Sequence, residues 1–313
     1  MSRAFIFPGQ GAQTIGMGKA LADAYPAARA VFEEVDTALG ESLSTLIWEG
    51  DQQELTLTHN AQPALMATSI AAFKALETEG FDISDASFVA GHSLGEYSAL
   101  AASGAISIAD TARLLRTRGE AMQKAVPVGL GAMAALLGLD FETAQAVAKE
   151  AAEAGDGEVC QAANDNDPGQ VVVSGHKAAV ERAVEIAKEK GAKRAVLLPV
   201  SAPFHCALMQ PAADVMADAL ARVDVSAPKV PLVANVLAEA VTDPARIREL
   251  LVEQVTGSVR WRESVAWMGA EGVTEMWEIG AGKALSGMVR RINRDIACAA
   301  VGTPDDIAKL KTA

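Results

Sequence analysis

A five-residue motif at positions 91–95, Gly-His-Ser-Leu-Gly, has the spacing of a turn that presents a nucleophilic serine. It follows an apolar run at 87–90 that predicts a strand, and it precedes an Ala-rich run that predicts a helix. A serine at such a junction lies on a sharp turn that exposes its hydroxyl, and the flanking glycines let strand and helix approach closely. The amide of Leu94 would then point toward an acyl carbonyl. We predict that Ser93 is a nucleophile; the alternative is a tight turn whose serine only caps the helix.

A nucleophilic serine needs a base, and the chain has four histidines. His59 and His176 lie in polar helix-start regions, and His92 lies on the strand side of the serine turn. His205 follows Ser-Ala-Pro-Phe, between a predicted strand and a predicted helix, where an inserted unit would rejoin its parent. A cleft between two domains is expected at such a junction. We therefore predict that His205 is the base; the alternative is a buried structural histidine.

Arg118 lies on the apolar face of a helix predicted over 108–125. Spacing by three and four residues places it with Leu114, Leu115 and Met122. A guanidinium on an apolar face is costly unless an anion pairs with it. That anion could be an internal Asp or Glu, or the carboxylate of a substrate, and the pattern leaves both open.

A glycine-rich segment, Gly9-Gln10-Gly11, follows the first predicted strand. A dinucleotide-binding fingerprint would need a third glycine at position 14, where Thr14 stands, so we reject that interpretation. Two glycines around Gln10 nevertheless let the backbone approach a ligand closely and donate an amide.

The composition excludes several classes of protein. Of 313 residues, 50% are hydrophobic and 21% charged, which excludes a disordered chain, and a net charge of −13 argues against a nucleic-acid binder. Three cysteines without a CxxC pair support neither a disulfide framework nor a metal cluster. The longest stretches without charged residues, 55–73 and 195–213, contain prolines and polar residues, so no membrane span is predicted. We expect a cytoplasmic protein with no membrane or nucleic-acid partner.

The order of predicted elements indicates an α/β fold with a small inserted domain. Residues 128–199 predict the order β-α-β-β-α-β, which is a ferredoxin-like unit, with Asn-Asp-Asn-Asp-Pro-Gly at 164–169 as a turn between its two middle strands. Helices and strands alternate on both sides of it. We predict an inserted ferredoxin-like subdomain at 127–200 within a core formed by 1–126 and 201–313.

Taken together, these motifs resemble the malonyl-CoA:acyl carrier protein transacylase family and its related acyltransferase domains, from residue 7 to about 301. The matching segments, in order, are Phe-Pro-Gly-Gln-Gly-Ala-Gln at 7–13, Gly-His-Ser-Leu-Gly-Glu at 91–96, Arg118-Gly119, Asn-Asp-Pro-Gly-Gln at 166–170, Pro-Phe-His at 203–205, and Gln254. The resemblance implies an α/β-hydrolase-like core with a ferredoxin-like insertion.

The same resemblance implies a role for each site residue. It implies Ser93 as nucleophile and His205 as its base, with Arg118 as the partner of the malonyl carboxylate. Gln10 and Leu94 would supply the oxyanion amides, and Gln254 would have a supporting role. No acidic third member is identifiable, and the family pattern does without one.

The implied reaction is ping-pong transfer of malonyl from coenzyme A to the pantetheine thiol of acyl carrier protein, through a malonyl-serine ester. It would supply fatty-acid synthesis, with polyketide synthesis as the other pathway, and needs no metal or redox cofactor. The rival enzyme is a serine thioesterase or esterase, whose motifs run Ser, Asp and a late His. Here no histidine follows His205. A binding module without catalysis would tolerate loss of Ser93.

Docking of an acidic carrier protein on a chain of net charge −13 needs a local positive field. Two clusters could supply it: Lys188, Lys190, Lys193 and Arg194, and Arg290 with Arg291. The alternative for each is an ordinary solvated face. We expect a monomer.

Overall fold

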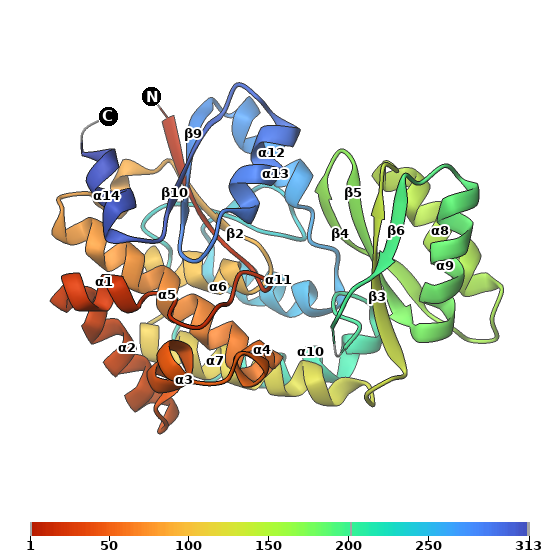
Figure 1. Ribbon diagram of the computed structural model, residues 1–313, viewed down its shortest axis with the longest axis horizontal. Coiled ribbons are helices and arrows are strands. Elements are labelled where there is room, and N and C mark those ends of the chain that lie inside the picture. The colour runs from red at the N-terminus through yellow and green to blue at the C-terminus, as the bar shows by residue number, and fades with distance from the viewer. Residues whose placement is uncertain (1, 201, 312–313) are drawn as a thin grey trace.

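Two β-sheets organise the chain in the computed structural model, which describes residues 2–200 and 202–311 (Figure 1). The first has six strands in the order β10-β9-β1-β2-β7-β8 and the second has four in the order β4-β5-β3-β6. The strands of the first are β1 (Ser2–Phe7), β2 (Phe88–Gly91), β7 (Leu232–Val233), β8 (Ala240–Val241), β9 (Val273–Ile279) and β10 (Ala297–Val301). Those of the second are β3 (Gly131–Leu137), β4 (Cys160–Asp167), β5 (Gln170–His176) and β6 (Arg194–Leu197).

Helices surround the first sheet and flank the second. Before the second sheet come α1 (Lys19–Ala24), α2 (Pro26–Leu39), α3 (Leu43–Glu49), α4 (Gln52–Thr56), α5 (Thr58–Thr78), η1 (Ile83–Asp85), α6 (Leu94–Ala102) and α7 (Ile108–Ala125). Helices α8 (Phe141–Glu153) and α9 (Lys177–Glu189) belong to the second sheet. After it come η2 (Ala207–Met209), α10 (Gln210–Leu220), α11 (Pro244–Thr256), α12 (Trp261–Ala270), α13 (Ala284–Ile292) and α14 (Pro304–Leu310).

Strand β1 is buried on both faces, as its continuous apolar sequence predicts. Phe5 and Phe7 pack into the larger core with α2, α5 and α7, whereas Ala4 and Ile6 pack into a second core with α12 and α13. Alternate side chains of a strand point to opposite faces, so β1 lies in the middle layer of three.

The parallel pairing of β1 and β2 brings two of the predicted motifs together. Phe7 lies opposite Gly91 at the ends of these strands, so the loops that follow leave the sheet side by side. Those loops carry Gln10 and Ser93. Ligands of open α/β sheets bind beyond the carboxyl ends of the strands, which is the edge these two residues share.

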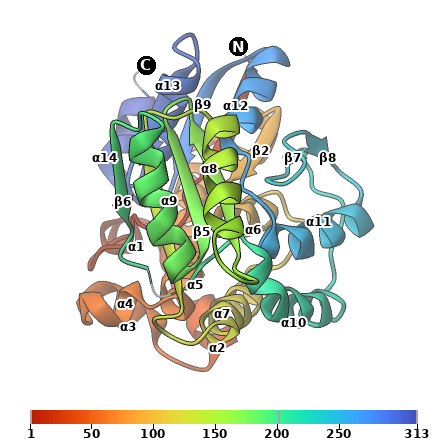
Figure 2. The same cartoon turned by 90° about the vertical axis from the view of Figure 1, so that its right-hand side faces the viewer.

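The second sheet is antiparallel and presents different surfaces on its two faces. Helices α8 and α9 cover the face that points away from the first sheet (Figures 1 and 2). On the opposite face Met133, Ala135, Ala163 and Val172 form a small apolar cluster, against which Phe204 packs. This second face therefore meets the chain just before His205.

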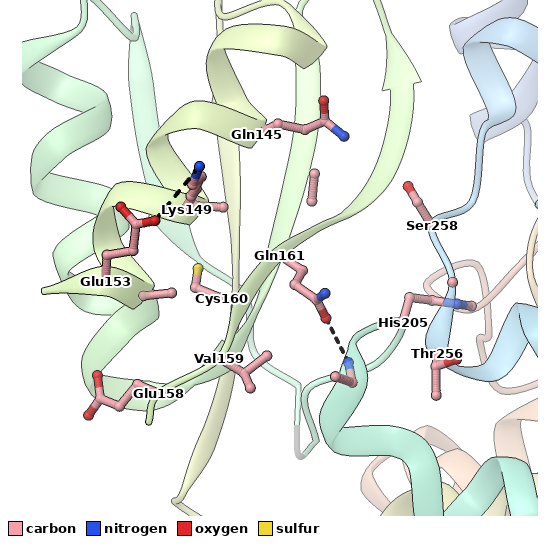
Figure 3. Close-up of a pocket in the computed structure, with 15 residues that line it drawn as sticks. Gln145, Lys149, Glu153, Glu158, Val159, Cys160, Gln161, His205, Thr256 and Ser258 are labelled. Carbon is pink, nitrogen blue, oxygen red and sulfur yellow. Dashed lines mark hydrogen bonds and ion pairs between the residues drawn. The ribbon is translucent and has the colours of Figure 1, made fainter. Parts of the chain in front are cut away.

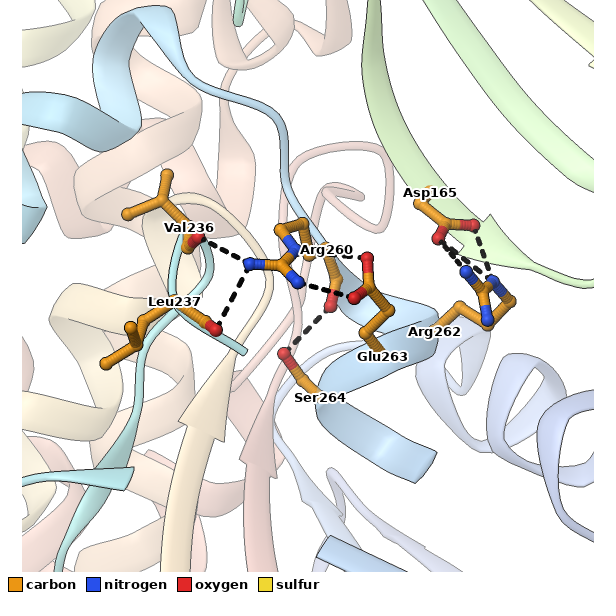
Figure 4. Close-up of polar contacts among 7 residues, drawn as sticks. All are labelled: Asp165, Val236, Leu237, Arg260, Arg262, Glu263 and Ser264. Atoms are coloured by element: carbon orange, nitrogen blue, oxygen red, sulfur yellow. Dashed lines mark hydrogen bonds and ion pairs between the residues drawn. The ribbon is translucent and has the colours of Figure 1, made fainter. Parts of the chain in front are cut away.

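The predicted turn at 164–169 is wrong in its extent, because β4 continues through Asp167. Tertiary contacts hold this polar stretch in strand conformation: Asn164 bridges to Val259, and both carboxylate oxygens of the buried Asp165 accept hydrogen bonds from Arg262. Figure 4 shows Arg262 on α12 facing Asp165, next to the Arg260 contacts. Asp167 also forms an ion pair, in which its Oδ2 accepts from Arg291 Nε at 2.7 Å. The second sheet is thus anchored to the first unit by buried carboxylates.

In the described part of the chain, the structure has no helix that combines the length and the apolar sequence required to cross a membrane. Within the same residues, no group of three or more His, Cys, Asp or Glu side chains is arranged to hold a metal ion.

Candidate active site

Ser93 lies on a strained turn between β2 and α6. Its φ and ψ are 53° and −109°, a backbone conformation that residues other than glycine seldom adopt. The turn is also too tight for side chains beside it: a Cβ on Gly91 would lie 1.9 Å from the carbonyl of Gly95, and one on Gly95 would lie 2.2 Å from the oxygen of Phe7. Only glycine therefore fits at positions 91 and 95. This geometry is that of a nucleophile elbow.

Asn235 holds this turn from the loop that follows the neighbouring strand β7. Its Oδ1 accepts the backbone N–H of Ser93 at 2.8 Å, and its Nδ2 donates to the oxygen of Gly91 at 2.7 Å. Sequence reasoning missed this residue. The available signal was its position directly after the predicted strand at 230–234, at the same sheet edge as the serine.

His205 lies within hydrogen-bond distance of the serine hydroxyl. Its Nε2 is 2.8 Å from Ser93 Oγ, and its Nδ1 is 2.9 Å from the backbone oxygen of Gln254. A carbonyl that accepts from Nδ1–H leaves Nε2 free to accept the serine proton. Burial lowers the pKa of His205 to about 3, and the positive charge of Arg118 adds to this effect, so the imidazole is neutral at physiological pH. A backbone carbonyl occupies the place of the acidic third residue.

Arg118 is buried, with 1% of its surface exposed, and its partners are neutral. Nη1 donates to Gln62 Oε1 at 2.7 Å, and Nη2 donates to Gln254 Oε1 at 2.9 Å and to Ser93 Oγ at 3.1 Å. Among residues 2–200 and 202–311, no carboxylate forms an ion pair with it. Burial lowers the pKa of the guanidinium. Of the two partners left open by the sequence, the internal carboxylate is therefore not what the guanidinium contacts.

One cavity of about 450 Å³ joins the predicted site residues. Its lining includes Gln10, Ser93, Leu94, Arg118 and His205. The second sheet closes part of it, with residues such as Met133 and Asn164. Gln254 lies behind this lining, where it contacts both Arg118 and His205.

A second cavity, of about 560 Å³, reaches His205 from a different set of residues (Figure 3). It lies between α8, β4 and the segment after α11, and His205 is the residue it shares with the first cavity. Cys160 lines it, but burial raises the pKa of that thiol to about 12, so it is not a thiolate nucleophile.

Comparison with known proteins identifies the family. A model for the acyl transferase domain matches residues 4–291. The chain is 50% identical over 304 residues to the malonyl CoA-acyl carrier protein transacylase of Bacillus subtilis (strain 168), covering 97% of this chain and 94% of the relative. It is 46% identical over 305 residues to the protein of the same name from Escherichia coli (strain K12), covering 97% of each. The chain belongs to the malonyl CoA-acyl carrier protein transacylase family.

Solved structures agree with this assignment. The fold matches an acyl-carrier-protein-S-malonyltransferase from Bartonella henselae with a TM-score of 0.96 and 58% identity, covering 100% of this chain and 99% of that one. A second match, with a TM-score of 0.96, 41% identity and full coverage of both chains, is a malonyl-transacylase in complex with its type II PKS acyl-carrier protein. The family predicted from the motifs is confirmed, and the chain is an acyltransferase with a mixed α/β fold.

The pKa of His205 predicts a pH dependence of stability. Between its ordinary value of 6.5 and about 3, the unfolded chain binds a proton at this residue that the folded chain does not. The stability that neutral His205 contributes is therefore present above pH 6.5 and lost as the pH falls, by up to about 1.4 kcal/mol per pH unit. Urea unfolding of wild type and His205→Gln at pH 7, 6 and 5 should give a shallower dependence for the variant. Parallel curves would contradict a depressed pKa.

Proposed function

We propose that this enzyme transfers a malonyl group from coenzyme A to acyl carrier protein through a malonyl ester of Ser93. The observation that carries the proposal is one cavity that joins a serine–histidine pair to a buried guanidinium that contacts only neutral groups in the described chain. The pair supports acyl transfer through a covalent intermediate, and the guanidinium supports an acyl group with a free carboxylate.

In the first half-reaction His205 Nε2 takes the proton of Ser93 Oγ, and Oγ attacks the thioester carbon. The negative charge moves to the carbonyl oxygen, which the amides of Gln10 and Leu94 would stabilise from the two sides of the cavity. Thr58 donates to Gln10 Oε1 at 2.9 Å and so orients that loop. The carbon–sulfur bond then breaks, and His205 returns its proton to the leaving thiolate, which departs as free coenzyme A.

The second half-reaction runs in the opposite direction. The pantetheine thiol of acyl carrier protein gives its proton to His205, and its sulfur attacks the ester carbon. The bond to Ser93 Oγ breaks, and His205 returns the proton to that oxygen. Both steps exchange one acyl bond for another, so the proposed chemistry requires neither a metal nor a redox cofactor.

Arg118 would bind the malonyl carboxylate while the ester exists. In the free enzyme its Nη2 donates to Ser93 Oγ, which places the guanidinium within reach of an acyl group bonded to that atom. Removal of water from the pair strengthens it, and the planar fork of arginine matches two carboxylate oxygens. A serine hydrolase acting on uncharged esters has no use for a buried cation here, which argues against the thioesterase alternative.

We also propose boundaries and folds for the two domains of the chain. Residues 127–200 would form the inserted ferredoxin-like subdomain, and 1–126 with 201–313 an α/β-hydrolase-like core. The element order β3-α8-β4-β5-α9-β6 and the sheet order β4-β5-β3-β6 support the first part. Residue 201, at the second boundary, lies outside the described residues. A cytoplasmic monomer serving fatty-acid synthesis remains the prediction.

Intact-mass analysis after mixing with malonyl-CoA tests the intermediate. We expect one malonyl adduct on the peptide that contains Ser93, and its disappearance when acyl carrier protein is added. Ser93→Ala should show no adduct, and His205→Ala should form it at least about 10²-fold more slowly. An adduct that persists in Ser93→Ala would overturn the nucleophile, and turnover without carrier protein at the same rate would favour a hydrolase.

The ratio of kcat/KM for malonyl-CoA to that for acetyl-CoA tests whether Arg118 binds the malonyl carboxylate. Removing one partner of a buried ion pair costs roughly 3–5 kcal/mol, and less where water enters, so Arg118→Ala should lose about 10²-fold or more in malonyl transfer. Acetyl transfer should be equal or faster, since acetyl has no carboxylate. Arg118→Lys should rescue poorly because lysine lacks the planar fork. An unchanged ratio together with a large loss of stability would make Arg118 a structural residue.

The two basic clusters predicted for carrier docking meet at one hollow, which Lys193 and Arg291 both line. Lys188 pairs with Glu185 on its own helix, and Arg291 pairs with Asp167, which also lines the hollow, so both charges are offset. Lys193 therefore supplies the positive charge of this hollow. Leu137 on β3 lines this hollow and Met133, about 13 Å away along the same strand, lines the active-site cavity. We propose this hollow as part of the docking surface.

Lys193→Glu should raise the KM for carrier protein about fivefold, or about 1 kcal/mol, and leave the KM for malonyl-CoA unchanged. Lys188→Glu makes the same charge change on an ion-paired side chain and serves as the matched control. Equal effects of the two substitutions would reflect net charge alone, and an equal rise in both KM values would point to the coenzyme A phosphates.

A further inference from the structure

A buried carboxylate lies behind the active site and does not line the cavity. Glu96, on the first turn of α6, has 1% of its surface exposed. Its Oε2 accepts two hydrogen bonds, from Gln254 Nε2 at 2.9 Å and from the backbone N–H of Asn235 at 3.0 Å. Its Oε1 has no hydrogen-bond partner among the described residues. A buried polar oxygen without a partner is costly, so the position of this side chain calls for an explanation.

We infer that Glu96 is a positioning residue: it fixes the orientation of the Gln254 amide and thereby provides Arg118 with a hydrogen-bond acceptor. This inference rests on the proposed function, because it concerns the site in which Arg118 would bind the malonyl carboxylate.

The two ends of the Gln254 amide have different partners. Its Nε2 donates to Glu96 and to the backbone oxygen of Ser93, at 2.9 and 3.0 Å. Its Oε1 consequently faces Arg118 Nη2 at 2.9 Å. If the amide turned over, an N–H₂ group would face the guanidinium, which is itself only a donor, and the oxygen would face the Glu96 oxygen. The favourable contacts with Glu96, Ser93 and Arg118 would become repulsive, so the Glu96 oxygen, together with the Ser93 oxygen, selects one of the two orientations.

The position of Glu96 also explains why Arg118 can remain free for a ligand. The carboxylate forms no ion pair with the guanidinium and is joined to it by hydrogen bonds through Gln254, although the two charges also attract each other directly. The guanidinium therefore retains its capacity to bind another carboxylate. Burial raises the pKa of Glu96 to about 7. A proton would be placed on the unpartnered Oε1, so Oε2 accepts the same two bonds in either protonation state.

Through Asn235 the same oxygen also supports the nucleophile. The backbone N–H of Asn235 donates to Glu96, while its side chain accepts from the Ser93 N–H and donates to the Gly91 oxygen. One carboxylate oxygen is therefore joined to the serine turn through one amide and to Arg118 through another. Loss of this oxygen should disturb recognition of the charged acyl group more than the chemistry that malonyl and acetyl share, because the elbow retains both Asn235 side-chain bonds.

The test compares substitutions that keep or remove the acceptor. Glu96→Leu and Glu96→Met remove it at similar volume, the second serving if the first does not fold, whereas Glu96→Gln keeps one carbonyl oxygen. Either apolar variant should lower the malonyl-to-acetyl ratio of kcat/KM at least tenfold, and Glu96→Gln should restore it to within about threefold of wild type. Ser98→Ala, which alters another buried side chain of α6, is the matched control and should leave the ratio unchanged.

Binding of malonate itself, measured by calorimetry, gives a readout that does not depend on the serine ester. We expect the apolar Glu96 variants to bind malonate at least tenfold more weakly than wild type, with Glu96→Gln close to wild type. A different outcome is that wild type forms no Ser93 adduct while the malonate affinities of wild type and the Glu96 variants still rank as expected. In that case the proposed reaction fails and the positioning role stands. Equal losses in malonyl and acetyl transfer, or a Glu96→Gln variant as impaired as Glu96→Leu, would overturn the inference.

Discussion

The arrangement of this active site depends on a buried guanidinium that has no carboxylate partner in the described chain. Taking a charge out of water without an opposite charge is among the most costly steps in folding. Here Arg118 is held by amide oxygens of Gln62 and Gln254, with Ser93 Oγ as a third acceptor. Neutral acceptors bind its two terminal nitrogens without neutralising its charge, and its Nε has no hydrogen-bond partner among the described residues. The site is therefore built to be completed by an anion that arrives with the substrate.

The catalytic pair depends on the same constraint. Burial lowers the pKa of His205 and the charge of Arg118 adds to this effect, so the histidine is neutral in the free enzyme. The backbone oxygen of Gln254 fixes its Nδ1. Gln254 thus contacts the base through its backbone and the guanidinium through its side chain. The backbone is strained at both reacting residues, with φ of 53° at Ser93 and 58° at His205. Strain of this kind persists only where surrounding contacts enforce it, which at Ser93 are the close-packed glycines and Asn235.

Much of this site could be predicted from local sequence, because its main residues follow or face predicted elements. Ser93 and Gln10 follow strands that pair in parallel, and the helical spacing placed Arg118 inward; helix 108–125 has the predicted bounds. The position of Asn235 after a predicted strand is a signal that it lies at this sheet edge, but it does not indicate what the residue contacts. The roles of Asn235 and Glu96 depend on hydrogen bonds between residues far apart in the chain. The same holds for β4, where tertiary ion pairs with Arg262 and Arg291 outweigh the turn preference of Asn and Asp.

The most direct test of this account is the free energy of unfolding of the acyl-enzymes, measured by urea denaturation of wild type carrying malonyl or acetyl on Ser93. If the malonyl carboxylate supplies the missing anion, the malonyl-enzyme should be more stable than both the acetyl-enzyme and the free enzyme. The difference between the two acyl-enzymes should disappear in Arg118→Met. Equal stability of the malonyl- and acetyl-enzymes in wild type would contradict the claim that Arg118 pairs with the carboxylate of the substrate.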